Sequence, residues 1–127
     1  MSAEFSFQVD SSRDLVRIRM GGFFTPEDIA AFLAARHEAH KLLTCRRNAH
    51  VTLNDIRDMK IQSQESVDAF RAMLAAPDYR SRRLAFIVSP TLARTQVMRA
   101  LDRREARCFE DMWRAEAWLF ARESAAA

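Results

Sequence analysis

The stretch RRLAFIV, residues 82–88, decides the fold of this protein. It is apolar without interruption from Leu84 to Val88, a pattern typical of a central strand in a parallel sheet that is covered on both faces. Parallel neighbours are joined by crossovers of a dozen or more residues, which are usually helices. The stretch therefore predicts an α/β fold in which strands and helices alternate along the chain.

The nearest predicted strand toward the N-terminus is AHVTLND, residues 49–55. We expect Asp55 at its exit and Arg57 and Asp58 in a polar turn that follows, because polar residues favour turns. Acid–base catalysis needs paired titratable groups in different environments, or a nucleophile with a base in reach. The turn holds two carboxylates but no histidine, cysteine or glycine-rich anion-binding segment nearby. The pattern therefore predicts a structural or binding role for both aspartates, and no enzyme activity.

Two amphipathic helices are predicted before the central strand. The first, at 25–43, begins with Thr25 as its cap, Pro26 at the first helical position and Asp28 three residues after the cap, which is the pattern of a capping box. The second covers residues 63–74. Their apolar faces, which should pack on the sheet, are formed by Ile29, Phe32, Leu33, His40 and Leu43 in the first helix and by Val67, Phe70, Met73 and Leu74 in the second.

The remaining segments complete the alternation. Residues 4–10 and 14–20 alternate apolar and polar side chains, and the short link between them predicts an antiparallel hairpin. After the central strand, the sequence predicts a helix at 89–101, a short strand at 106–109 and a final helix at 110–122.

The predicted order of elements is therefore ββαβαβαβα. It corresponds to a single domain over residues 1–127, with one mixed, mostly parallel five-stranded sheet, about four flanking helices and a frayed tail from about residue 122. The composition, 49% apolar and 29% charged, is that of a globular domain. No apolar run approaches the roughly 20 residues of a membrane span, and the N-terminus has no signal-peptide pattern. We expect a cytoplasmic protein without a membrane span.

Positive charge is concentrated in one third of the chain. Residues 79–107 contain eight arginines and two acidic residues, although the net charge of the whole chain is +3. Binding of single-stranded nucleic acid relies on aromatic side chains for stacking, and Tyr79 alone accompanies these arginines. The pattern favours a solvated or partner-docking face, and we expect no nucleic-acid partner.

His37 and His40 are spaced i, i+3 on the first helix, so both could reach one metal ion. A zinc site needs three or four converging ligands, and no Glu or Cys completes this set. We therefore predict no metal and no other cofactor.

Four segments, together with the order of elements, resemble the STAS-like superfamily. These are relatives of the SpoIIAA-type anti-sigma-factor antagonists, and the chain resembles in particular the small stand-alone bacterial proteins grouped as STAS/SEC14-like. The segments are GGFFTPEDIAAFLAARHEAH at 21–40, VTLNDIRDM at 51–59, RRLAFIVSPT at 82–91 and CFEDMWRAEAWL at 108–119. The resemblance covers almost the whole chain and implies a SpoIIAA/STAS-like fold.

In regulatory STAS domains, the third strand ends in Asp-Leu-Ser, and an Asp-Ser-x-Gly-like motif whose serine is phosphorylated opens the next helix. Asp55 matches the aspartate at the strand end, and Ile56 and Arg57 replace the pair that follows. The helix opens with IQSQES, without the aspartate and the glycine of the motif. Ser63 or Ser66 lies near the position of the phosphorylated serine.

A second group of polar residues lies beyond the central strand. Ser89 and Thr91 are placed at a helix start, with Arg94 one turn further on, where free amides favour an anion. The same pattern also describes an ordinary serine cap. Loops beyond the carboxyl ends of parallel strands are where open α/β sheets bind ligands. The candidate ligand or partner loop therefore comprises Asp55, Asp58, Ser63, Ser66, Ser89, Thr91 and Arg94.

These observations favour a non-enzymatic STAS-like regulatory or protein-interaction module. The alternative is a carrier of a small molecule or lipid, as the SEC14-like kinship implies, with an apolar pocket between helices and sheet near Phe32, Phe70 and Met73. The same three residues serve a plain core equally well.

The last helix contains more large apolar residues than one buried side can hold. We expect Trp118 and Leu119 to pack on the sheet and the remainder, Trp113, Met112 and Phe120, to leave apolar surface exposed. Phe23 and Phe24 are expected to contribute to this surface. Exposed apolar patches usually mark interfaces, so the sequence predicts a homodimer.

Overall fold

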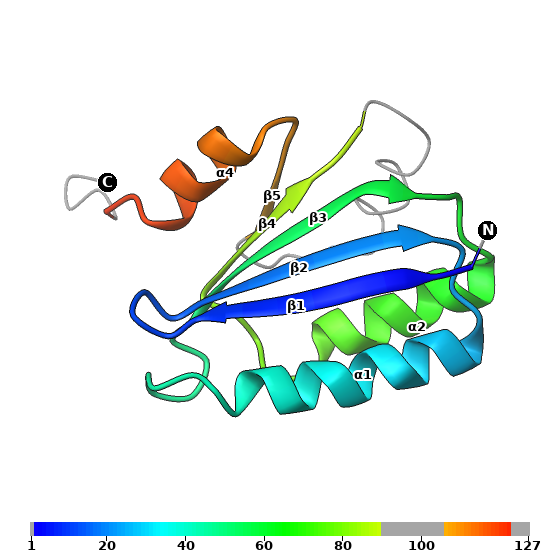
Figure 1. Ribbon diagram of the computed structural model, residues 1–127, viewed down its shortest axis with the longest axis horizontal. Helices are drawn as coiled ribbons and strands as arrows, with labels where there is room; N and C mark the ends of the chain where they lie inside the picture. Colours follow the sequence, from blue (N-terminus) through cyan, green and yellow to red (C-terminus); the bar gives the residue numbers. More distant parts are fainter. Residues whose placement is uncertain (1, 90–105, 123–127) are drawn as a thin grey trace.

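The computed structural model describes residues 2–89 and 106–122 (Figure 1). A mixed sheet has the strand order β1-β2-β3-β4-β5, in which β1 and β2 are antiparallel and all later neighbours are parallel. The strands are β1 (Glu4–Asp10), β2 (Leu15–Gly22), β3 (Val51–Met59), β4 (Arg83–Ile87) and β5 (Ala106–Phe109), and the helices are α1 (Pro26–His40), α2 (Gln64–Ala75) and α4 (Met112–Leu119). The predicted α/β fold is confirmed. The helix predicted at 89–101 lies outside the described residues, so the structure describes three helices where about four were expected.

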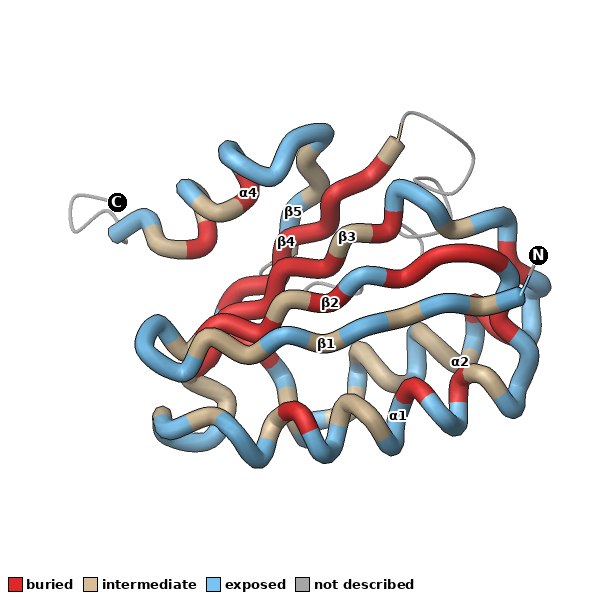
Figure 2. Tube along the Cα trace, in the orientation of Figure 1, coloured by how far each residue is buried: buried red, intermediate tan, exposed pale blue. Residues whose placement is uncertain are grey.

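Helices cover the sheet on both faces, as Figure 1 shows. Helices α1 and α2 lie together on one face, and α4 lies on the other, against β3, β4 and β5. Figure 2 shows that β4 is buried along its whole length, whereas the edge strand β1 is not. The prediction of a central strand at 84–88 that is covered on both faces is therefore confirmed.

Five phenylalanine rings fill the space between the sheet and the pair α1–α2. Phe32 of α1 is 1% exposed, and its ring lies 5.1–6.4 Å, between centroids, from each of the other four rings. Those four rings belong to Phe5, Phe7, Phe24 and Phe70. Phe32 and Phe70, which the carrier hypothesis names, belong to this cluster, and Met73 packs against the same core.

Helix α1 begins as the sequence predicts. The Asp28 amide donates to Thr25 Oγ1 over 3.2 Å, and the Thr25 amide donates to the Asp28 carboxylate over 2.9 Å, so both halves of the capping box are present. The predicted apolar face is wrong at Leu33, which is 40% exposed. Consecutive helical residues are turned by about 100°, so Leu33 points away from the sheet when Phe32 points into the core.

Strand β3 is longer than the sequence predicts. It continues through Met59, so Asp55 lies within the strand, and the prediction of a turn at Arg57 and Asp58 is wrong. Ile56 is 3% exposed and points into the core, and the charged residues on either side of it, Asp55 and Arg57, pair with each other. The two steps from Arg19 to Gly21 in β2 are matched by three from Asp55 to Asp58 in β3, so β3 contains one extra residue there. This irregularity interrupts the alternation of the strand, and Asp58 pairs with Arg19.

Arg83, at the start of β4, is buried beneath the end of α4. Its guanidinium donates to the carbonyl oxygens of Trp118 and Ala121 over 2.6 and 2.8 Å, at the C-terminal end of α4, where the helix dipole favours positive charge. This arginine therefore fastens α4 to the sheet and does not belong to a solvated face. The predicted inward packing of Trp118 and Leu119 is confirmed. No helix in the described residues is long and apolar enough to cross a membrane.

We predict that Phe32→Ala lowers the free energy of unfolding by about 3–5 kcal/mol, because the change removes a ring in contact with four others and leaves a cavity. Leu33→Ala, one residue further along the same helix, should change it by about 0.5 kcal/mol or less because Leu33 is exposed. Urea denaturation of the two variants measures the difference. Equal losses would show that the rings around Phe32 do not form the core.

Candidate functional site

The candidate site lies where the parallel strands end and α2 begins. Asp55 and Asp58 project from the last part of β3, and Ser63 and Ser66 belong to the first turn of α2. Ser89 follows β4 at the same end of the sheet, because Asp55 pairs with Ile87 in register. These five residues therefore share one end of the fold. Thr91 and Arg94 lie outside the described residues.

Asp55 is held by its neighbour two residues along the strand. Arg57 donates to its carboxylate from Nε over 3.0 Å, from Nη2 over 2.7 Å and from the backbone amide over 3.2 Å. These hydrogen bonds from Arg57 lower the pKa of Asp55, although partial burial acts in the opposite direction. At neutral pH Asp55 is therefore ionised and neutralised by an arginine, which makes it a poor proton acceptor.

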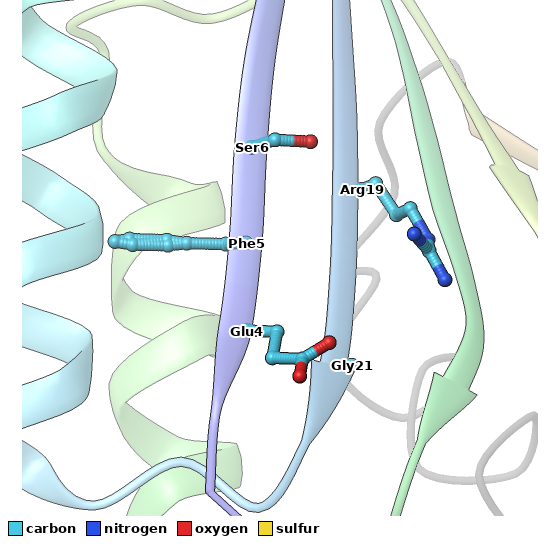
Figure 3. A pocket seen from close by; sticks show the side chains of 5 residues that line it. All are labelled: Glu4, Phe5, Ser6, Arg19 and Gly21. Atoms are coloured by element: carbon cyan, nitrogen blue, oxygen red, sulfur yellow. The ribbon is translucent and has the colours of Figure 1, made fainter.

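Asp58 pairs with Arg19 of β2, whose Nη2 lies 2.7 Å from the carboxylate. Both side chains are exposed, and a pair of this kind contributes little to stability. Beside it, Glu4, Ser6 and Arg19 point away from the helices around a shallow hollow of about 160 Å³ (Figure 3). The hollow is too small and open to enclose a metabolite. Its charged rim is better suited to surface contacts.

Gln62 links the loop before α2 to the loop before α1. Its side chain accepts a hydrogen bond from the Phe24 amide over 2.9 Å and donates to the Gly22 carbonyl over 3.0 Å. The Lys60 amide also donates to Gly22. Gln62 is 7% exposed, so these bonds are made in a buried place where an unpaired backbone group would be unfavourable. We call this arrangement the Gln62 clamp.

The two serines of α2 serve the local structure in different ways. Ser63 caps the helix, because its Oγ accepts from the Ser66 amide over 3.1 Å, and its side chain remains exposed. Ser66 is 2% exposed, and its hydroxyl donates to the Phe24 carbonyl over 2.8 Å. Of the two serines near the STAS phosphorylation position, Ser63 is therefore the accessible one.

Sequence reasoning missed Gln62, although it lies in the quoted segment IQSQES. A glutamine in a loop is ordinarily solvated, and nothing in its neighbours indicates that it reaches backbone groups 38 and 40 residues away in sequence. The missed ion-pair partners, Arg19 and Arg57, lie in predicted strand and turn segments. In the described residues, no group of three His, Cys, Asp or Glu side chains is placed to hold a metal.

We predict that Arg57→Ala raises the pKa of Asp55, because it removes two hydrogen-bond donors from the carboxylate. A lowered folded-state pKa stabilises the protein above the unfolded pKa, and this contribution is lost as the pH falls through the folded pKa. The variant should therefore lose stability relative to wild type at neutral pH but not in strong acid. A carboxyl ¹³C NMR titration measures the pKa, with Arg114→Ala on α4 as the control. If the titration midpoint of Asp55 were unchanged in Arg57→Ala, Arg57 would not be the group that lowers its pKa.

A search of solved structures places this architecture among known folds. The chain is similar to the crystal structure of an uncharacterised protein of the DUF3478 family, with a SpoIIAA-like fold, from Shewanella loihica. The TM-score is 0.69 and the sequence identity 22%, over 94% of this chain and 96% of that chain. No protein-family model and no curated protein matches the sequence. The likeness is one of fold, and this protein therefore has the SpoIIAA-like fold that its sequence resemblance implies.

Proposed function

We propose that this protein is a non-enzymatic STAS-like interaction module that binds a protein partner at the clamp surface, formed by Phe23, Ile61 and Ser63 around the Gln62 clamp. One observation carries the proposal. Phe23 is 38% and Ile61 53% exposed, and the clamp holds the two loops that bear them side by side. Exposed apolar side chains on a rigid backbone beside charged residues are typical of interaction surfaces.

The chemistry of the neighbouring polar residues supports binding over catalysis. The carboxylates of Asp55 and Asp58 are each occupied by an arginine, and the hydroxyls of Ser63 and Ser66 serve a helix cap and a backbone carbonyl. A general base or nucleophile must be free to reach a proton or a reacting atom. The ion pairs of the two aspartates and the hydrogen bonds of the two serines make these groups less available for such a role. A surface of paired charges around two apolar side chains instead gives orientation and specificity to a docked protein.

If binding is regulated by phosphorylation, Ser63 is the residue that we propose for modification. Its side chain is exposed at the N-terminus of α2, where the helix dipole favours negative charge. A phosphoryl group there would add charge directly beside Ile61. Ser66 would first have to leave its buried hydrogen bond with Phe24.

The proposed function predicts that the double variant Phe23→Ser, Ile61→Ser loses its partner. The tagged protein is incubated with a lysate of the source organism, and the retained complex is identified by native mass spectrometry, which also reports any phosphoryl group. Leu42→Ser is the matched control, because Leu42 is 64% exposed but lies beyond the end of α1. A partner retained equally by wild type, control and double variant would refute binding at the clamp surface.

We also propose that the protein is a homodimer that buries the outer side of α4. Trp113 is 84% exposed and Met112 41% exposed at the start of this helix, while its other side packs on the sheet. An exposed tryptophan beside a methionine is a strong candidate for an interface anchor.

For the dimer, we expect sedimentation of the wild-type protein at micromolar concentration to give a dimer and Trp113→Ser to shift it toward monomer. Loss of a central tryptophan anchor typically weakens association by about 2 kcal/mol or more, which is roughly thirtyfold in the dissociation constant. Leu42→Ser is the control, because Leu42 is an exposed apolar residue that lies beyond α1 and away from α4. A wild-type monomer at this concentration would exclude the dimer.

A further inference from the structure

A second polar region lies at the opposite end of the sheet, where α1 ends and β3 and β4 begin. A cavity of about 360 Å³ is bounded there by the segment after α1 and the segment before β4. Its volume is within the range of sites that bind small molecules. The residues that line it and matter to the argument are His40, Arg46, Arg47, Asn48 and Tyr79.

The two segments that bound this cavity are tied to each other. Arg47 Nη2 lies 2.6 Å from the carboxylate of Asp78, and the side-chain amide of Asn48 donates to the Pro77 carbonyl over 3.0 Å. Asn48 and Tyr79 both have left-handed backbone angles, with φ of 62° and 59°. Such angles are unfavourable for a tyrosine, so the surrounding contacts must hold this backbone, as is common at binding sites.

His40 has a fixed tautomer in this cluster. Its Nδ1 lies 2.7 Å from the Arg36 carbonyl, and because a carbonyl only accepts, Nδ1 must carry the proton. Its ring packs against those of Tyr79 and His50, with centroids 4.6 and 4.9 Å away. Burial lowers the pKa of His40, so the ring is neutral at physiological pH. Nε2 is then a hydrogen-bond acceptor.

Two acceptors in the cavity wall lack a donor. Within residues 2–89 and 106–122, neither His40 Nε2 nor Asn48 Oδ1 has a hydrogen-bond partner, and both atoms are buried. Buried polar groups nearly always have partners, so an unpaired acceptor calls for an explanation. Because both residues line the cavity, a small outward movement of the segment after α1 would bring these atoms into contact with a ligand that carries donors.

Positive charge lies beside these acceptors. Arg46 and Arg47 are exposed and line the cavity. Of the two acidic groups nearby, Asp78 is paired with Arg47 and Asp14 accepts hydrogen bonds from Thr44. Arginine side chains bind phosphate and carboxylate groups through charge-assisted hydrogen bonds. The cavity thus combines anion-binding groups with acceptors that suit hydroxyl groups.

We propose that this cavity binds a small polyhydroxylated anion, whose anionic group lies against Arg46 and Arg47 and whose hydroxyl groups donate to His40 Nε2 and Asn48 Oδ1. Sugar phosphates and sugar acids share this chemistry. The site is separate from the clamp surface, so either proposal can fail without the other. Occupancy would offer the protein a way to respond to a metabolite.

The proposal is tested by NMR titration with ribose 5-phosphate, gluconate, ribose and inorganic phosphate. The imidazole ¹⁵N signals of His40 and the backbone amides of 44–50 and 78–81 are followed. We expect ribose 5-phosphate or gluconate to saturate these signals, with ribose and inorganic phosphate each binding at least about tenfold more weakly. A preference for one of the two anions identifies the anionic group.

Matched variants locate the binding groups. Arg46→Ala should lower the affinity for the anionic probe about tenfold. Asn48→Gly should lower it by a similar factor, and glycine tolerates the left-handed backbone at this position. Arg114→Ala removes an equally exposed arginine on α4 and should bind as wild type. Amide spectra outside the cavity verify that each variant is folded. No saturable shift with any probe, inorganic phosphate binding as tightly as ribose 5-phosphate, or equal affinity in all variants would overturn the proposal.

Discussion

The burial of Phe24 and Phe32 is the interaction on which the other features of this end of the structure depend. Their rings form the aromatic core between α1, α2 and the sheet. The backbone of Phe24 also accepts from Ser66 and donates to Gln62, so the residue that anchors the core also fixes the loops before α1 and α2. Hydrophobic burial of these rings drives the folding of this region, and the buried hydrogen bonds determine the conformation of the two loops. The backbone of the clamp surface is therefore tied directly to the core beneath it.

Several arginines of this protein pair with carboxylates or backbone carbonyls of the protein itself. Arg57 and Arg19 neutralise the carboxylates of β3, and Arg83 lies buried under the end of α4, where it binds free carbonyls. Arg83, a member of the arginine-rich segment 79–107, is therefore part of the interior and not of a solvated face.

The two ends of the sheet have different physical characters. At the carboxyl end of the parallel strands, polar groups are paired and two apolar side chains, Phe23 and Ile61, remain exposed, which suits the docking of a protein. At the amino end, a cavity holds unpaired acceptors and left-handed backbone at Asn48 and Tyr79, which suits a small polar ligand. Open α/β sheets usually bind ligands at the carboxyl end, so the ligand site that we propose in the cavity departs from the general arrangement.

Local sequence determined the elements of this fold. The apolar run at 84–88, the capping box at Thr25 and the alternation in β1 and β2 depend on neighbours in the chain, and these features were predicted correctly. Tertiary structure alone decided the length of β3, the role of Gln62 and the pairing of Asp58, since each requires a partner from a distant segment. Helical periodicity and capping act over a few residues, whereas burial and hydrogen bonding of a loop side chain depend on what the rest of the chain brings beside it.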